Sequence, residues 1–200
     1  GHLDKELPRY EFQKKRWSKV GKKNTALAMQ IEAILQGLAN ASFLAFPAFI
    51  ISSNPSQQIS ILEIIGIVIW LASFIMESVA DVQKLTYLRA MKKSGASNMV
   101  CNIGLWKYSR HPNYFAEWMV WNALVIASIP SWLNLYQNMS VLIFVLVGVG
   151  LLLTSRIMYV TLVTYTGAIP SEYYSVQKRP TYKDYQHTTN MFFPGPTKQN

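Results

Sequence analysis

The residues best suited to chemistry lie near the middle of the chain, in the segment GLWKYSRHPNYFAE. Pro112 suits the first turn of a helix, because its missing N–H would be unpaired there in any case. A helix that begins at Pro112 places Asn113 and Glu117 on one face, since residues four apart share a face. Arg110 and His111 directly precede that helix. A carboxylate one turn inside a membrane helix is costly to expose to lipid. The pattern therefore predicts a site for a polar, phosphate-bearing ligand with an apolar neighbour.

Further charged candidates lie upstream of this segment, in the stretch ESVADVQKLTYLRAMKK. Glu77, Asp81 and Lys84 repeat at helical spacing, and Arg89 follows them. A solvated helical face with internal ion pairs would explain this pattern as well as ligand binding does. The spacing by itself leaves both interpretations open.

A third group of candidates lies in the C-terminal segment KRPTYKDYQHTTNMFFPGP, in which aromatic residues alternate with cations and hydroxyls. Tyr182 and Tyr185 are three residues apart and can share a helical face. Arg179 precedes them. This segment either covers a ligand or forms an interfacial plug that binds nothing.

The elements that position these residues are membrane helices. The chain has 200 residues, of which 50% are hydrophobic and only 14% are charged. Its apolar residues form runs that approach the ~20 residues of a membrane span. The hydropathy pattern predicts an all-α, polytopic membrane bundle with about four spans and additional interfacial helices. The predicted spans are residues 26–51, 59–80, 115–136 and 139–160.

Basic residues gather at three places, and the formal net charge is +9. Eight Lys and Arg residues lie between Lys5 and Lys23, and six lie between Lys84 and Arg110. Four spans then place both termini and the central loop on the positive-inside face. Such charge indicates membrane topology and contact with anionic lipid headgroups. Nucleic acid is not an expected partner, because no recognised binding module accompanies the charge.

The organisation predicted from these patterns has a basic interfacial lead-in over residues 1–24 and a transmembrane domain over 25–200, with a C-terminal lid over 168–196. The chain begins with Gly inside a charged segment, which is typical of a processed or incomplete product.

The sequence offers little for metal or nucleophilic chemistry. His2, His111 and His187 lack the spacing of zinc or iron ligands, so no metal site is expected. The single cysteine, Cys101, excludes an intramolecular disulfide. Ser109 and His111 are too close in sequence to indicate a catalytic dyad.

With these residues described, the chain resembles the C-terminal domain of the steroid 5-alpha-reductase family, and within it the reductase-like membrane proteins with the motif LWxYSRHPNYxGE. The match also includes Asp81 and the downstream pattern RPxYxxYxxxTxxFxP. The matching residues are Leu105, Trp106, Tyr108, Ser109, Arg110, His111, Pro112, Asn113, Tyr114, Glu117, Arg179, Pro180, Tyr182, Tyr185, Thr189, Phe192 and Pro194.

The resemblance implies an NADPH-dependent reductase of a lipid-like conjugated enone, with this chain as its cofactor-binding portion. In such enzymes the cofactor carries the hydride chemistry and the protein orients it. Asn113 and Glu117 resemble the family's cofactor-contacting pair, and Asp81 resembles the acid that positions the nucleotide. The full cofactor-binding set implied is Asp81, Lys84, Arg89, Arg110, His111, Asn113, Tyr114, Glu117, Arg179, Tyr182 and Tyr185. Lys84, Arg89 and Arg110 are the candidate phosphate partners, and the tail around Tyr185 resembles a lid.

Two departures from the family pattern keep alternatives open. Ala116 stands where the motif has glycine. The family's additional N-terminal helices, with the Tyr and Glu that polarise the substrate carbonyl, precede the region that resembles this chain. No catalytic residue is therefore assigned. The first alternative is a non-catalytic accessory subunit of a larger membrane complex. The second is a methyltransferase of the isoprenylcysteine type, whose paired acids are not found beside Glu172. The endoplasmic reticulum is the expected membrane, with the inner mitochondrial membrane as the alternative.

Overall fold

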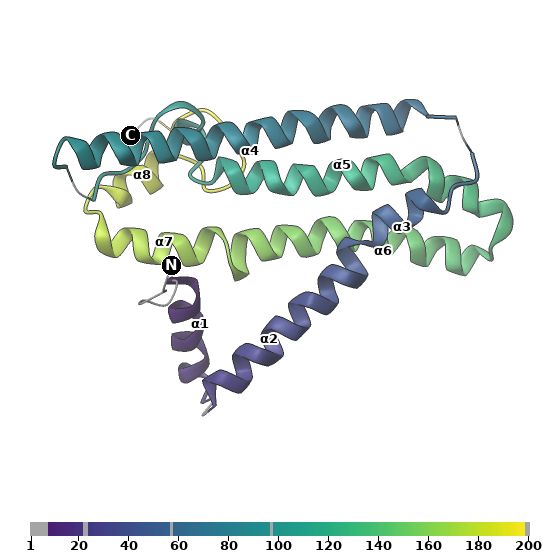
Figure 1. Ribbon diagram of the computed structural model, residues 1–200, viewed down its shortest axis with the longest axis horizontal. Helices are drawn as coiled ribbons and strands as arrows, with labels where there is room; N and C mark the ends of the chain where they lie inside the picture. Colours follow the sequence, from purple (N-terminus) through teal and green to yellow (C-terminus); the bar gives the residue numbers. More distant parts are fainter. Residues whose placement is uncertain (1–7, 22–23, 57, 97, 199–200) are drawn as a thin grey trace.

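The computed structural model describes residues 8–21, 24–56, 58–96 and 98–198. Over these residues the protein is all helical, which confirms the predicted fold class (Figure 1). The first seven residues of the expected lead-in, with His2, lie outside the described part. The α-helices are α1 (Pro8–Lys19), α2 (Thr25–Ala39), α3 (Phe46–Ser52), α4 (Ile61–Lys93), α5 (Pro112–Leu135), α6 (Val141–Val160), α7 (Ala168–Lys178) and α8 (Tyr182–Thr188). Short π-helical turns are η1 (Asn40–Leu44) and η4 (Thr161–Tyr165), and 3-10 turns are η2 (Gly104–Lys107) and η3 (Tyr136–Asn138).

Three helical segments of the described chain are long and apolar enough to cross a membrane: Thr25–Ser52, Ile61–Lys93 and Val141–Lys178. The hydropathy pattern predicts about four spans, and the other expected one corresponds to α5. With 24 residues, α5 has the length of a span. Polar residues such as Asn113, Glu117 and Asn122 make α5 less apolar than the other three segments. They are tolerated because α5 packs inside the bundle, against α3, α4 and α6.

The helices α4, α5 and α6 lie side by side along the long axis of the molecule, and α7 continues the line of α6 (Figure 1). The N-terminal part is arranged differently. Helix α2 leaves the bundle at an angle, and α1 lies between the start of α2 and α7 (Figure 1). The helices α1, α2 and α6–α7 thus form the three sides of a triangle.

Helix α4 has a strong start signal and a close contact with α5. The hydroxyl of Ser60 accepts a hydrogen bond from the Glu63 amide, while the Glu63 carboxylate accepts one from the Ser60 amide at 2.6 Å. This capping box satisfies two amides that the helix itself leaves unpaired. One turn later Gly66 is buried against Ala123 and Ala127 of α5. Small residues let the two backbones approach closely, as is common between membrane helices.

Candidate functional site

The turn η2, which leads into the predicted site, is fixed to α4. Gly104 has a φ of +54°, in the left-handed region that favours glycine. The next amide, that of Leu105, donates to the Gln83 side-chain oxygen at 2.9 Å. The indole of Trp106 donates to the Ala80 carbonyl at 2.8 Å, and the Lys84 ammonium lies 4.0 Å from the Trp106 ring centroid. These contacts with α4 therefore fix the position of η2 and of the loop that follows it.

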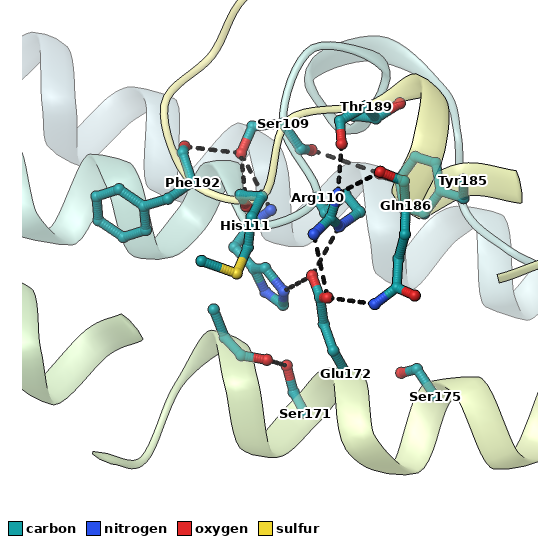
Figure 2. Close-up of polar contacts among 12 residues, drawn as sticks. Ser109, Arg110, His111, Ser171, Glu172, Ser175, Tyr185, Gln186, Thr189 and Phe192 are labelled. Atoms are coloured by element: carbon teal, nitrogen blue, oxygen red, sulfur yellow. Dashed lines mark hydrogen bonds and ion pairs between the residues drawn. The ribbon is translucent and has the colours of Figure 1, made fainter. Parts of the chain in front are cut away.

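Arg110 and His111 are buried and converge on one carboxylate, that of Glu172 on α7 (Figure 2). The Arg110 guanidinium donates to both Glu172 oxygens, from Nε at 2.7 Å and from Nη2 at 3.1 Å. Its remaining Nη1 donates to the carbonyls of Gln186, at 3.0 Å, and Thr189. His111 Nε2 lies 3.0 Å from Glu172 Oε1, and the Gln186 amide donates to Oε2 at 2.6 Å. The resemblance implies that Arg110 is a phosphate partner, whereas in the structure its charge is paired inside the protein.

Burial lowers the pKa of the His111 imidazole below its usual value, because a charged ring would lose its hydration. The neighbouring Glu172 carboxylate opposes this shift without reversing it. Neutral His111 also stacks on Tyr114, with ring centroids 5.3 Å apart. The ring therefore joins the Glu172 network to the first turn of α5.

The C-terminal segment is bonded along the loop before α5 by a series of hydrogen bonds (Figure 2). Ser109 donates to the Phe192 carbonyl at 2.9 Å, and the Arg110 amide donates to the Asn190 carbonyl at 2.9 Å. The Tyr185 hydroxyl donates to the Trp106 carbonyl. Burial raises the pKa of Tyr185 far above its usual range, so the phenol is a neutral donor. These contacts make residues 182–195 a closed cover on the loop.

Under this cover lies a small cavity of about 50 Å³. Three of its lining groups are basic side chains, those of Lys84, Arg110 and Arg179. Tyr182 and Tyr185, both predicted from the sequence to belong to the site, form part of its wall. Burial also raises the pKa of Tyr182 well above its usual range. The small basic cavity thus brings together six of the predicted residues: Lys84, Arg110, His111, Arg179, Tyr182 and Tyr185.

A second set of predicted residues lies between α4 and α5. The Asn113 amide donates to the Asp81 carboxylate at 3.0 Å. The other end of that amide, Asn113 Oδ1, is buried and has no hydrogen-bond partner among the described residues. A buried acceptor without a partner costs stability, so it marks a place where a ligand could donate.

The remaining predicted residues, Tyr114, Glu117 and Arg89, lie away from these two groups. Tyr114 and Glu117 line a large cavity of about 860 Å³ between α2–α3 on one side and α5–α6 on the other. Its walls are mostly apolar, with Leu44, Trp121 and Leu162 among them. We refer to it as the large cavity. Arg89 is exposed on α4 and lines neither the large nor the small cavity.

Sequence reasoning missed two contributors to the site. Glu172 is a lone acid in the sequence, yet it receives Arg110, His111 and Gln186. Gln83 lies two residues after Asp81 and orients η2. A single acid in an amphipathic helix does not by itself indicate a site. Glu172 is recognised as part of the site only because its carboxylate contacts Arg110 in the folded protein.

No curated protein and no solved structure matches the chain significantly. A family described as "protein of unknown function (DUF1295)" matches residues 4–189, which is most of the chain and includes every lining residue of the small and the large cavity. The protein therefore belongs to the DUF1295 family.

Proposed function

We propose that this chain is the cofactor-binding portion of an NADPH-dependent membrane reductase whose substrate is a lipid-like conjugated enone. The observation that supports this most is the large cavity, with its apolar wall and a volume of about 860 Å³. Sites for small apolar ligands have volumes of ~300–1,000 Å³ and few polar groups. Among the described residues that line it, Tyr114 and Glu117 are ionisable.

Predicted residues outside the large cavity fit the chemistry of a dinucleotide. Asp81 and Asn113 would hold its nicotinamide-bearing part, because the buried Asn113 oxygen still accepts a hydrogen bond. Lys84 and Arg179 would hold the phosphates, since both line the small cavity and a cation forms charge-assisted bonds with phosphate. Arg110 acts indirectly: its pairing with Glu172 positions the loop that carries His111 and Asn113.

The small cavity, at about 50 Å³, is too small for a dinucleotide. The proposal therefore includes an outward movement of α8 and the segment after it when the cofactor binds. The hydrogen bonds of Tyr185 and Ser109 would open in that movement.

When bound, NADPH supplies the hydride. The protein's part is to exclude water and to orient the substrate. Tyr114 is placed for this, because it lines the large cavity and stacks on His111. Glu117, one turn further along α5, presents a carboxyl group to the same space.

The direct test is titration of the full chain in lipid nanodiscs with NADPH, followed by calorimetry or nucleotide fluorescence. We expect saturable binding, with NADPH favoured over NADH, and consumption of NADPH when a hydrophobic cyclic enone is added. Binding without turnover would restrict the chain to cofactor capture. No saturable binding in either membranes or detergent would refute the proposal.

The accessory-subunit interpretation is the second candidate, and one observation favours it. The side chains of Arg110 and Tyr185 are engaged within the protein, and the cavity beside them is only about 50 Å³. A scaffold that has lost catalysis would show this closed arrangement. Co-purification with a larger membrane complex at fixed stoichiometry, together with no nucleotide binding, would support it.

A further inference from the structure

A third cavity lies next to the large one, between α1, α2 and η4. It has a volume of about 250 Å³ and is lined by residues of α1, α2 and the end of η4. We refer to it as the α1–α2 cavity. Trp17, Met29 and Ala33 supply apolar wall, and Gln13, Glu32 and Tyr165 supply polar groups.

The two cavities adjoin. Gln36 of α2 and Thr166, just after η4, line both of them. The shared lining joins the two into one elongated chamber beside α2. Figure 1 shows helix α2 running obliquely from α1 to the bundle. The chamber is apolar around Leu44 and Trp121, and at its end next to α1 it is lined by the polar side chains of Gln13, Glu32 and Tyr165.

That polar end is a connected cluster. The Gln13 amide, whose residue is only 9% exposed, donates to both oxygens of the Glu32 carboxylate at 3.3 and 3.4 Å. The Tyr165 phenol lines the same cavity as Glu32 and Gln13. Arg16 lies 5.7 Å from the Tyr165 ring centroid. Three separate elements, α1, α2 and η4, therefore contribute polar groups to one cavity that contains Glu32.

Glu32 is in a segment apolar enough to cross the membrane, where a carboxyl group is costly and therefore marks a candidate functional site. Its bonds to Gln13 are long, and a carboxyl group has more acceptor positions than one amide fills. Spare acceptor capacity thus faces the chamber. A ligand that donates a hydrogen bond fits this end, and an anion does not.

We propose that the Gln13–Glu32–Tyr165 cluster binds the hydroxyl group of a lipid alcohol whose apolar body lies in the large cavity. An ammonium group could also donate to Glu32, but the guanidinium of Arg16 beside Tyr165 disfavours a second cation there. The hydroxyl needs no countercharge and can also accept from the Gln13 amide. Identification of this lipid as the substrate depends on the reductase proposal, and the binding site itself does not.

The test uses the full chain in phosphatidylcholine nanodiscs, with radiolabelled hexadecanol as the probe and hexadecyl methyl ether as its matched analogue without a donor. We expect saturable hexadecanol binding above that of empty nanodiscs, and binding of the ether about tenfold weaker, as a hydrogen bond to a charged group predicts. Glu32→Leu should weaken hexadecanol binding about tenfold and leave ether binding unchanged. Tyr165→Phe should weaken hexadecanol binding by a smaller factor.

Two variants serve as controls. Gln30→Leu changes a residue of α2 that lines neither cavity, so it should bind hexadecanol like the unmodified protein. Glu32→Gln keeps the side-chain shape in case Glu32→Leu does not fold, and it too should weaken hexadecanol binding.

Equal affinity for hexadecanol and its ether would overturn the proposal, as would unchanged hexadecanol binding by folded Glu32→Gln. Tighter binding of hexadecylamine than of hexadecanol would overturn the assignment to an alcohol. These measurements involve neither NADPH nor turnover. Failure of NADPH binding with preserved discrimination between alcohol and ether would therefore refute the reductase and leave the lipid site standing.

Discussion

Arg110 and Glu172 form a two-point ion pair, with Nε–Oε1 at 2.7 Å and Nη2–Oε2 at 3.1 Å, although 62 residues separate them in the chain. Both side chains are buried. The pair fastens the loop before α5 to α7, and His111 and Gln186 join the same carboxylate. The same guanidinium also donates to the Gln186 and Thr189 carbonyls, so Arg110 connects the loop, α7 and the end of α8 beside the small basic cavity.

Removal of the arginine should therefore destabilise the protein strongly. Arg110→Leu leaves Glu172 buried without its partner, and breaking a buried pair in this way costs about 3 kcal/mol or more. Thermal unfolding in detergent would measure the loss. The matched control is Arg89→Leu, which changes an exposed arginine of α4 and should alter the free energy of unfolding by about 0.5 kcal/mol or less. Similar melting temperatures for the two variants would contradict the role of the ion pair.

Stability should fall on mild acidification because of His111. Its pKa is lowered in the folded protein, chiefly by burial, from the usual 6.5. The unfolded chain consequently takes up a proton at a pH where the folded protein does not, so stability decreases as pH falls from about 6.5 through the lowered value. The melting temperature measured between about pH 8 and pH 5 should show this decline. His111→Gln should flatten this part of the profile, whereas His187→Gln, at an exposed position of α8, should leave it intact.

The contact between α4 and α5 should not accept a methyl group at Gly66. A Cβ there would lie 2.8 Å from both the Ala123 carbonyl oxygen and the Ala127 methyl. Gly66→Ala should therefore cost about 1–3 kcal/mol by overpacking. Gly37 of α2 has no atom within 4 Å of the same position, so Gly37→Ala should stabilise by up to about 1 kcal/mol. Opposite shifts in the melting temperatures are expected, and equal shifts would exclude close packing at Gly66.

The unpaired oxygen of Asn113 predicts a change in ligand binding. Under the reductase proposal, Asn113→Ala removes a buried acceptor for the cofactor, so the Kd for NADPH should rise about tenfold. Asn134→Ala is the control, because Asn134 also makes a side-chain amide bond, to Asn54, and lies at the other end of α5. Equal Kd values for the two variants would remove Asn113 from the cofactor site.

The sequence by itself determined the class of the protein and the start of its central helix. Its apolar runs have about the length of a membrane span, and in lipid the backbone groups of a single span can bond only within a helix. Pro112 fixed the beginning of α5, because a first-turn position tolerates its missing N–H, and the structure starts α5 at that residue. The predicted pair on one face of α5 is divided between two places: Asn113 bonds to Asp81, whereas Glu117 lines the large cavity.

Only the tertiary structure decided which charges are free. Arg110 and Lys84 are equally plausible phosphate partners in the sequence, yet Arg110 is paired with Glu172, and Lys84 lies over Trp106. Likewise, the surroundings of Glu32 come from other elements: Gln13 of α1 donates to it, and Tyr165 of η4 lines the same cavity. Local spacing reports which residues share a helix face, but the pairing of a charge depends on distances between helices. Those distances are set when the whole bundle packs, so no single stretch of the chain contains them.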